Sequence, residues 1–142
     1  MLIRKLEFND YEKYIILINE FRPSIFTEIQ FIDTLTYIKL SGDVWVIEDN
    51  SQLLATGTII YEKKMIFNIC KYAHLEDICV SEKFRGKGYG KMIVNKLKYE
   101  SIKNGCHKIT LDCNDSNLDF YVKCGFSKRG NQMTELVSNL KR

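Results

Sequence analysis

The sequence has little that would interrupt a single globular fold. Only one of its 142 residues is proline, and no Ser/Gly-rich stretch forms a linker. It has no internal repeat and no low-complexity tract. This length allows one sizeable core and is short for two. We therefore expect one domain over residues 1–142.

Long apolar runs are also missing. None approaches the ~18 residues that a membrane-spanning helix needs. The first residues, MLIRKLEFNDYEKY, carry too many charges for the apolar core of a signal peptide. These absences predict a cytoplasmic protein with no membrane partner.

Metal-binding and disulfide patterns are absent as well. The five cysteines are odd in number and none has C-x-x-C spacing, which favours buried free thiols. The only histidines, His74 and His107, have no carboxylate or cysteine at metal-ligand spacing. We predict that the protein holds no metal.

The charge balance is mild. Lys and Arg number 21 and Asp and Glu 18, which gives a net charge of +3, and the pI is about 8.5. Basic nucleic-acid binders usually show a clustered basic face and a pI above about 9. This net charge is compatible with the binding of anionic small molecules and gives no reason to expect a nucleic-acid partner.

Periodicity and turn residues predict a mixed α/β domain with a largely antiparallel sheet flanked by helices. Thr27 and Gln30 have the spacing of a capping box, and Gly42 follows the helix that they would start. Met92 or Ile93, with Leu97 and Ile102, should form the buried side of a later helix. The expected strands are 3–8, 43–48, 53–62, 65–70, 73–80, 108–113 and 131–140, and the expected helices follow Asn9–Asp10 and span 27–42, 91–104 and 117–124.

The stretch FRGKGYGKMI, residues 84–93, places three glycines and three cations between a predicted strand and a predicted helix. Glycines there let backbone N–H groups approach a phosphate near a helix N-terminus, and Arg85, Lys87 and Lys91 can add charge-assisted hydrogen bonds. The spacing fits neither a Walker A loop nor a Rossmann fingerprint. KGYG resembles the start of an RNA-binding RNP1 strand, but helical periodicity follows it. By itself, the stretch could equally be a surface turn that caps a helix.

The context of the loop indicates a family. VSEKFRGKGYGK resembles the R/Q-x-x-G-x-G/A acyl-CoA loop of the GNAT acetyltransferases, with Arg85, Gly88 and Gly90 in the motif positions. LEDICV before the loop, and HKITLDC and FYVKCGF after it, resemble the glucosamine 6-phosphate N-acetyltransferases. This resemblance extends from Phe26 to Met133. It implies a GNAT fold, acetyl-CoA as co-substrate, and synthesis of N-acetylglucosamine 6-phosphate for UDP-N-acetylglucosamine.

The resemblance also implies roles for individual residues. The loop would bind the CoA pyrophosphate through backbone amides, and the strand before it would align the pantetheine arm. The implied cofactor-binding residues are Ile78, Cys79, Val80, Arg85, Gly86, Lys87, Gly88, Tyr89, Gly90, Lys91, Asn117 and Tyr121. The implied substrate-binding residues are Thr27, Lys64, Met65, Ile66, Phe67, Glu76, Asp77, Ile78, His107 and Lys108.

Acetyl transfer needs a deprotonated amine, an aligned thioester, oxyanion stabilisation and a proton for the leaving thiolate. We expect Asp77 to orient the amine and Glu76 to take its proton, with a β-bulge bringing these neighbours to one site. Tyr121 could donate a hydrogen bond to the CoA sulfur, although it could equally be a core residue packed on Phe120 and Phe126. The resemblance implies that Asp112 shapes the site, whereas from sequence alone it could cap a helix.

One departure bears on the substrate. The family usually has an arginine three residues after the position of Met133, and here that residue is Leu136. Lys64 and Lys108 would then carry more of the phosphate. Alternatively, the enzyme acetylates another small amine or a protein N-terminus, or the chain is a non-catalytic acyl-CoA-binding regulator. The resemblance further implies a homodimer that exchanges C-terminal strands.

Overall fold

The computed structural model describes residues 1–140, in which the chain forms two units, 1–111 and 112–140. The first unit holds a five-stranded sheet in the order β1-β2-β3-β4-β5, antiparallel except for the parallel β4–β5 pair. This confirms the expected mixed α/β architecture. Its elements are β1 (Leu2–Lys5), α1 (Tyr11–Phe21), α2 (Glu28–Ile38), β2 (Gly42–Asp49), β3 (Gln52–Lys64), β4 (Cys70–Val80), α3 (Tyr89–Lys103) and β5 (Lys108–Thr110).

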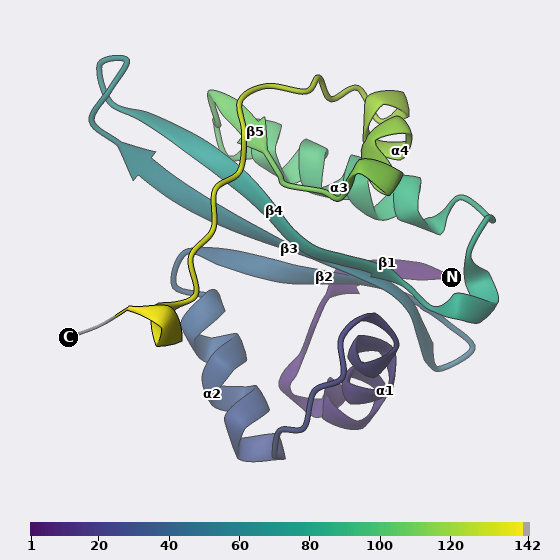
Figure 1. Cartoon of the computed structure of the whole chain (residues 1–142). Coiled ribbons are helices and arrows are strands. Elements are labelled where there is room, and N and C mark those ends of the chain that lie inside the picture. The colour runs from purple at the N-terminus through teal and green to yellow at the C-terminus, as the bar shows by residue number, and fades with distance from the viewer. Residues whose placement is uncertain (141–142) are drawn as a thin grey trace. The chain divides into compact units, whose positions relative to one another are not determined.

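The helices of the first unit lie on both faces of the sheet (Figure 1). α3 packs on β2, β3 and β4, while α1 packs on β3 and β4 and α2 on β2. The core between the sheet and helices α1 and α2 includes Leu6, Leu17, Phe31, Leu35 and Val46. Ile93, Val94 and Leu97 of α3 are fully buried. The sheet is therefore covered on two sides, as an amphipathic sheet requires.

The second unit contains a short helix, α4 (Leu118–Lys123), and two three-residue 3-10 helices, Asp115–Asn117 and Val137–Asn139. Gly125, with a φ of 96°, ends α4 as expected. The strand predicted over 131–140 is not formed, so that prediction was wrong. A strand needs a neighbour with which to share its backbone hydrogen bonds, and among the described residues this segment pairs with none.

The structure also corrects several other boundaries. Residues 65–69, predicted as part of a strand, form the turn between β3 and β4. Phe67, Asn68 and Ile69 have φ values of 51°, 58° and 70° there, which apolar residues rarely adopt. The short strand 108–113 ends at Thr110. α2 ends at Ile38 rather than running to Gly42, because Gly42 begins β2, where a Cβ would collide with the carbonyl oxygen of Ile59.

The predicted start of the α2 helix was right, whereas the prediction for α3 needs correction. The Thr27–Gln30 capping box of α2 is confirmed, with hydrogen bonds of 2.9 and 3.1 Å in the two directions. α3 starts at Tyr89, two residues earlier than expected. Ile102 is 74% exposed rather than buried, because α3 turns the side chains of Glu100 and Ser101 inward instead.

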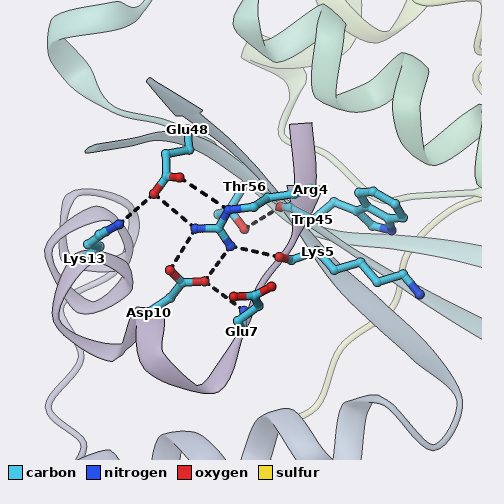
Figure 2. A network of polar contacts seen from close by, with 8 residues as sticks. All are labelled: Arg4, Lys5, Glu7, Asp10, Lys13, Trp45, Glu48 and Thr56. Carbon is cyan, nitrogen blue, oxygen red and sulfur yellow. Dashed lines mark hydrogen bonds and ion pairs between the residues drawn. The ribbon is translucent and has the colours of Figure 1, made fainter. Parts of the chain in front are cut away.

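A polar network fastens α1 to the edge of the sheet (Figure 2). The Arg4 guanidinium donates to both carboxylate oxygens of Asp10, at 2.7 and 2.8 Å, and to Glu48. Lys13 of α1 reaches the same Glu48 carboxylate at 2.7 Å. The Asp10 side chain also accepts from the Glu7 amide instead of capping α1. The network therefore joins β1, β2 and the start of α1, the helix that contacts β4 near its C-terminal end.

Candidate active site

β4 carries a β-bulge at Asp77, as the carboxylate hypothesis required. Thr56 of β3 pairs with Cys79, but Thr58 pairs with Glu76, so β4 has one residue more than β3 between these pairs. Asp77 has a φ of 51°, a left-handed conformation that aspartate tolerates better than most residues. The extra residue interrupts the two-residue alternation of the strand.

The bulge brings the two carboxylates to one face of the sheet. A Cβ on Gly57 would meet Leu97 of α3, so the opposite face carries Thr56 and Thr58 and their partners Cys79 and Glu76. The Cys79 thiol lies 3.9 Å from the Leu17 carbonyl oxygen of α1, which identifies this as the α1 face. The charge of Asp77 acts on the buried Tyr14 of α1, so Asp77 lies near this face too, and both carboxylate residues are exposed.

Tyr14 of α1 lies beside the bulge, and it was not predicted from the sequence as a residue of the site. Its phenol shares a hydrogen bond with Thr56, and burial raises its pKa to about 12, with the charge of Asp77 adding to the rise. Helical spacing alone marks Tyr14 as a core residue, and its position next to Asp77 depends on how α1 packs on β4.

The same face of the sheet continues toward the β3–β4 turn as a polar face, formed by Glu62, Lys64, Tyr72, His74, Glu76 and Lys108. Glu62 lies 3.2 Å from the Lys64 ammonium and 3.1 Å from His74 Nε2. Hydrogen bonds from His74 and Lys64 lower the pKa of the exposed Glu62. This face joins the bulge to a cluster of cations.

The cations gather around Tyr72. The Lys64 and Lys108 ammonium nitrogens lie 4.9 and 4.5 Å from the centroid of its ring. His107 stacks on Tyr72 and on Phe67, with centroid distances of 6.2 and 5.1 Å. Four of the expected substrate-binding residues, Lys64, Phe67, His107 and Lys108, therefore lie together.

Other expected substrate-binding residues lie elsewhere. Met65 and Ile66 are exposed in the β3–β4 turn. Thr27 is at the start of α2, where its hydroxyl accepts a hydrogen bond from the Gln30 amide. Ile78 follows the bulge and lies near Gly57, on the side of the sheet that α3 covers.

The glycine loop connects the end of β4 to α3. Gly86 and Gly88 have φ values of 75° and 90°, and Gly88 is the residue immediately before α3. No atom lies within 4 Å of where their Cβ atoms would be. Arg85, Gly86, Lys87, Gly88 and Lys91 are all exposed. The loop thus presents flexible cations and backbone groups at a helix N-terminus, an arrangement that favours an anion.

Neighbouring side chains hold this loop. Arg85 Nε donates to the Val80 carbonyl oxygen at 3.2 Å. Glu20, from the last turn of α1, accepts hydrogen bonds from the Glu82 amide at 2.9 Å and the Ser81 hydroxyl at 3.4 Å. Tyr89 contacts Phe84 edge-on, and Lys87 lies over the Phe84 ring. Glu20 is distant from this loop in the sequence, so no local sequence pattern predicts its contribution.

Cys79 has the properties of a structural thiol. It is buried, and this burial raises its pKa to about 11. At neutral pH the residue is therefore a thiol rather than the thiolate that nucleophilic chemistry requires.

The remaining predicted site residues, Asp112, Asn117 and Tyr121, belong to the second unit. Tyr121 contacts Phe120 and Phe126 edge-on, and burial raises its pKa to about 12. Asp112 accepts a hydrogen bond from Gln132 at 2.9 Å. Asn117 is the residue immediately before α4.

Residues 1–140 contain no group of three or more His, Cys, Asp or Glu side chains that could hold a metal ion. None of their helices is long and apolar enough to cross a membrane.

Comparison with known proteins identifies the family of the chain. The Acetyltransferase (GNAT) family matches residues 9–126, a range that crosses both units. The chain is 36% identical to glucosamine 6-phosphate N-acetyltransferase 1 of Dictyostelium discoideum over 92% of this chain and 87% of that protein. It is 33% identical to the Candida albicans glucosamine 6-phosphate N-acetyltransferase over 92% of this chain and 91% of that protein.

A solved structure of a glucosamine 6-phosphate N-acetyltransferase has the same fold. The crystal structure of glucosamine-6-phosphate N-acetyltransferase from Arabidopsis thaliana matches with a TM-score of 0.91 and 35% identity, covering 96% of this chain and 97% of that one. GNAT acetyltransferases use acetyl-CoA as the acetyl donor. The resemblance noted in the sequence is confirmed: the chain belongs to the Acetyltransferase (GNAT) family and, within it, to the family of the glucosamine 6-phosphate N-acetyltransferases.

Proposed function

We propose that this protein transfers an acetyl group from acetyl-CoA to the 2-amino group of glucosamine 6-phosphate, giving N-acetylglucosamine 6-phosphate and CoA. The observation that carries the proposal is the bulge at Asp77, which puts two neighbouring carboxylates on the sheet face that also carries the Lys64–Lys108 cluster. An amine and a phosphate on one small molecule call for acidic and basic groups on a shared surface.

In the proposed complex, exposed cations and backbone amides of residues 85–91 bind the CoA pyrophosphate. Ile78, Cys79 and Val80 align the pantetheine arm, and one of their amides polarises the thioester carbonyl. Lys64 and Lys108, with Phe67 and His107 beside them, hold the sugar phosphate. Asn117 contacts CoA, and Asp112 shapes the site. Thr27, Met65, Ile66 and Ile78 complete the substrate contacts.

The chemical step is a direct attack in a ternary complex. The substrate ammonium loses a proton to Glu76, directly or through water, while Asp77 orients the resulting amine. The amine nitrogen bonds to the thioester carbon and the carbon–sulfur bond breaks. The nitrogen's second proton passes, directly or through water, to the departing CoA sulfur, so that a neutral amide and CoA result. Tyr121, protonated at neutral pH because its pKa is about 12, donates a hydrogen bond to that sulfur. The buried Cys79 thiol forms no acetyl intermediate.

We further propose that the protein is a cytoplasmic, metal-independent homodimer with a single catalytic domain. The apolar side chains of Met133, Leu136, Val137 and Leu140 are exposed in residues 131–140, which supports pairing of this segment with a second copy of the chain. No nucleic acid or membrane takes part.

Release of free CoA tests the substrate. Glucosamine 6-phosphate, glucosamine and spermidine should be compared as acceptors. We expect fast release with the phosphorylated sugar and slow release with the other two. Leu136, which replaces the family arginine, favours spermidine or another amine as the alternative acceptor. Release with spermidine alone would replace the proposal by that alternative, and CoA binding without any release would indicate a regulator.

A further inference from the structure

We infer that Tyr72 is a positioning residue that sets the two lysines for a phosphate monoester dianion. This inference rests on the proposed function, which places the substrate phosphate at Lys64 and Lys108. It adds a residue that the family resemblance does not assign. It also explains how this chain could bind the substrate phosphate with Leu136 in place of an arginine.

The geometry centres on one ring. Tyr72 lies on β4 between β3 and β5, is only 8% exposed, and has Lys108 as its direct partner across the parallel β4–β5 pair. Lys64 comes from the end of β3 and Lys108 from the start of β5, yet both ammonium groups lie over this ring. The buried ring is thus a fixed point that two flexible side chains share.

The physical role follows from charge. Two ammonium groups brought together repel each other, and each also has a long, flexible stem. The negative face of an aromatic ring attracts a cation by about 0.5–2 kcal/mol, depending on its exposure to solvent. Tyr72 therefore offsets the repulsion and reduces the freedom that the lysines lose when phosphate binds.

Neighbouring groups fit the same interpretation. His107 stacks nearly parallel to Tyr72, at an interplanar angle of 15°, which limits movement of the ring. Glu62 pairs with Lys64 at 3.2 Å, and His74 contacts the same carboxylate oxygen. A substrate phosphate can take the place of Glu62 at Lys64, while His74 keeps its contact with Glu62.

The variants Tyr72→Leu and Tyr72→Phe test the inference, because phenylalanine keeps the aromatic face and leucine removes it. Tyr61→Leu is the matched control. Tyr61 lies on the neighbouring strand, also under a lysine (Lys71, 5.7 Å), but on the opposite face of the sheet. We expect Tyr72→Leu to raise the KM for glucosamine 6-phosphate about tenfold, with Tyr72→Phe and Tyr61→Leu near wild type. The KM for acetyl-CoA and kcat/KM for unphosphorylated glucosamine should not change.

Calorimetric binding of glucose 6-phosphate, which has the phosphate but no amine, separates the inference from the proposed function. Weaker binding by Tyr72→Leu alone supports the role of Tyr72 even if the wild-type protein fails to acetylate glucosamine 6-phosphate. Unchanged binding and KM in Tyr72→Leu would overturn the inference while leaving the reaction intact. Equal losses for glucosamine and its phosphate would also overturn it, because they would indicate a general packing defect.

Discussion

At the scale of single residues, Asp10 shows how a buried charge can stabilise the fold. Burial opposes ionisation of its carboxyl group, but hydrogen bonds from Arg4 and from the Glu7 amide outweigh burial and lower its pKa. A carboxyl group whose pKa is lower in the folded than in the unfolded chain stabilises the fold above the unfolded value of about 3.9. That contribution is lost as the pH falls through the lower, folded value.

Replacing Asp10 by Asn should therefore destabilise the protein at neutral pH, by roughly 2–4 kcal/mol, because it leaves the Arg4 charge partly buried without its main partner. Urea unfolding measures the effect. The difference from wild type should shrink as the pH falls below about 4. Asp33→Asn, at an exposed position in α2, serves as control. A destabilisation equal to that of the control would contradict the structural role of Asp10.

The second prediction at this scale concerns the two carboxylates at the bulge, Glu76 and Asp77. Asn can adopt the left-handed conformation of Asp77, so Asp77→Asn removes charge with little added strain. We expect Glu76→Gln to lower kcat/KM at least about a hundredfold and to remove its acid-side dependence on pH, as loss of a general base does. Asp77→Asn should lower kcat/KM too. Profiles with wild-type pH dependence in both variants would exclude the proposed roles.

At the scale of elements, the strand–loop–helix unit around Gly88 was predictable because its signals are local. The glycine spacing, the β-branched residues before it and the helical periodicity after it all lie within one stretch of sequence. The turn at 65–69 was missed because its apolar residues suggest a strand, while three residues of the turn, Phe67, Asn68 and Ile69, have positive φ. The role of Tyr72 was also missed, since its two lysines meet only through the register of three strands.

The Gly88 turn supports the third prediction. Gly88→Ala introduces backbone strain at a φ of 90°, although there is space for the added methyl group. We expect a higher KM for acetyl-CoA, because the strained loop presents its amides less well to the pyrophosphate. Gly105→Ala is the matched control, with a φ of 68° and equal space but a position at the other end of α3. If both variants have the same KM for acetyl-CoA, the loop does not bind the cofactor as proposed.

At the scale of the whole molecule, the expected last strand is the clearest difference between sequence and structure. The alternation of residues 131–140 indicates a strand, but a strand also needs a neighbour, and a single chain offers this segment none among the described residues. The proposed homodimer would supply that neighbour from a second copy.

Sedimentation tests this proposal. We expect twice the chain mass of 16.7 kDa for the wild-type protein and a lower average mass for Val137→Lys, which places a charge in the exposed apolar segment. Lys128→Ala, just before the segment, should sediment as wild type does. A wild-type monomer with full activity would rule out a catalytic homodimer.

The central claim is that the 2-amino group of glucosamine 6-phosphate is the acceptor. NMR analysis of the product formed from acetyl-CoA and this sugar tests it most directly. The account predicts a single N-acetylated product in which the acetyl amide is attached to C2 and the phosphate is retained. Absence of this product from an enzyme that still acetylates another amine would contradict the account.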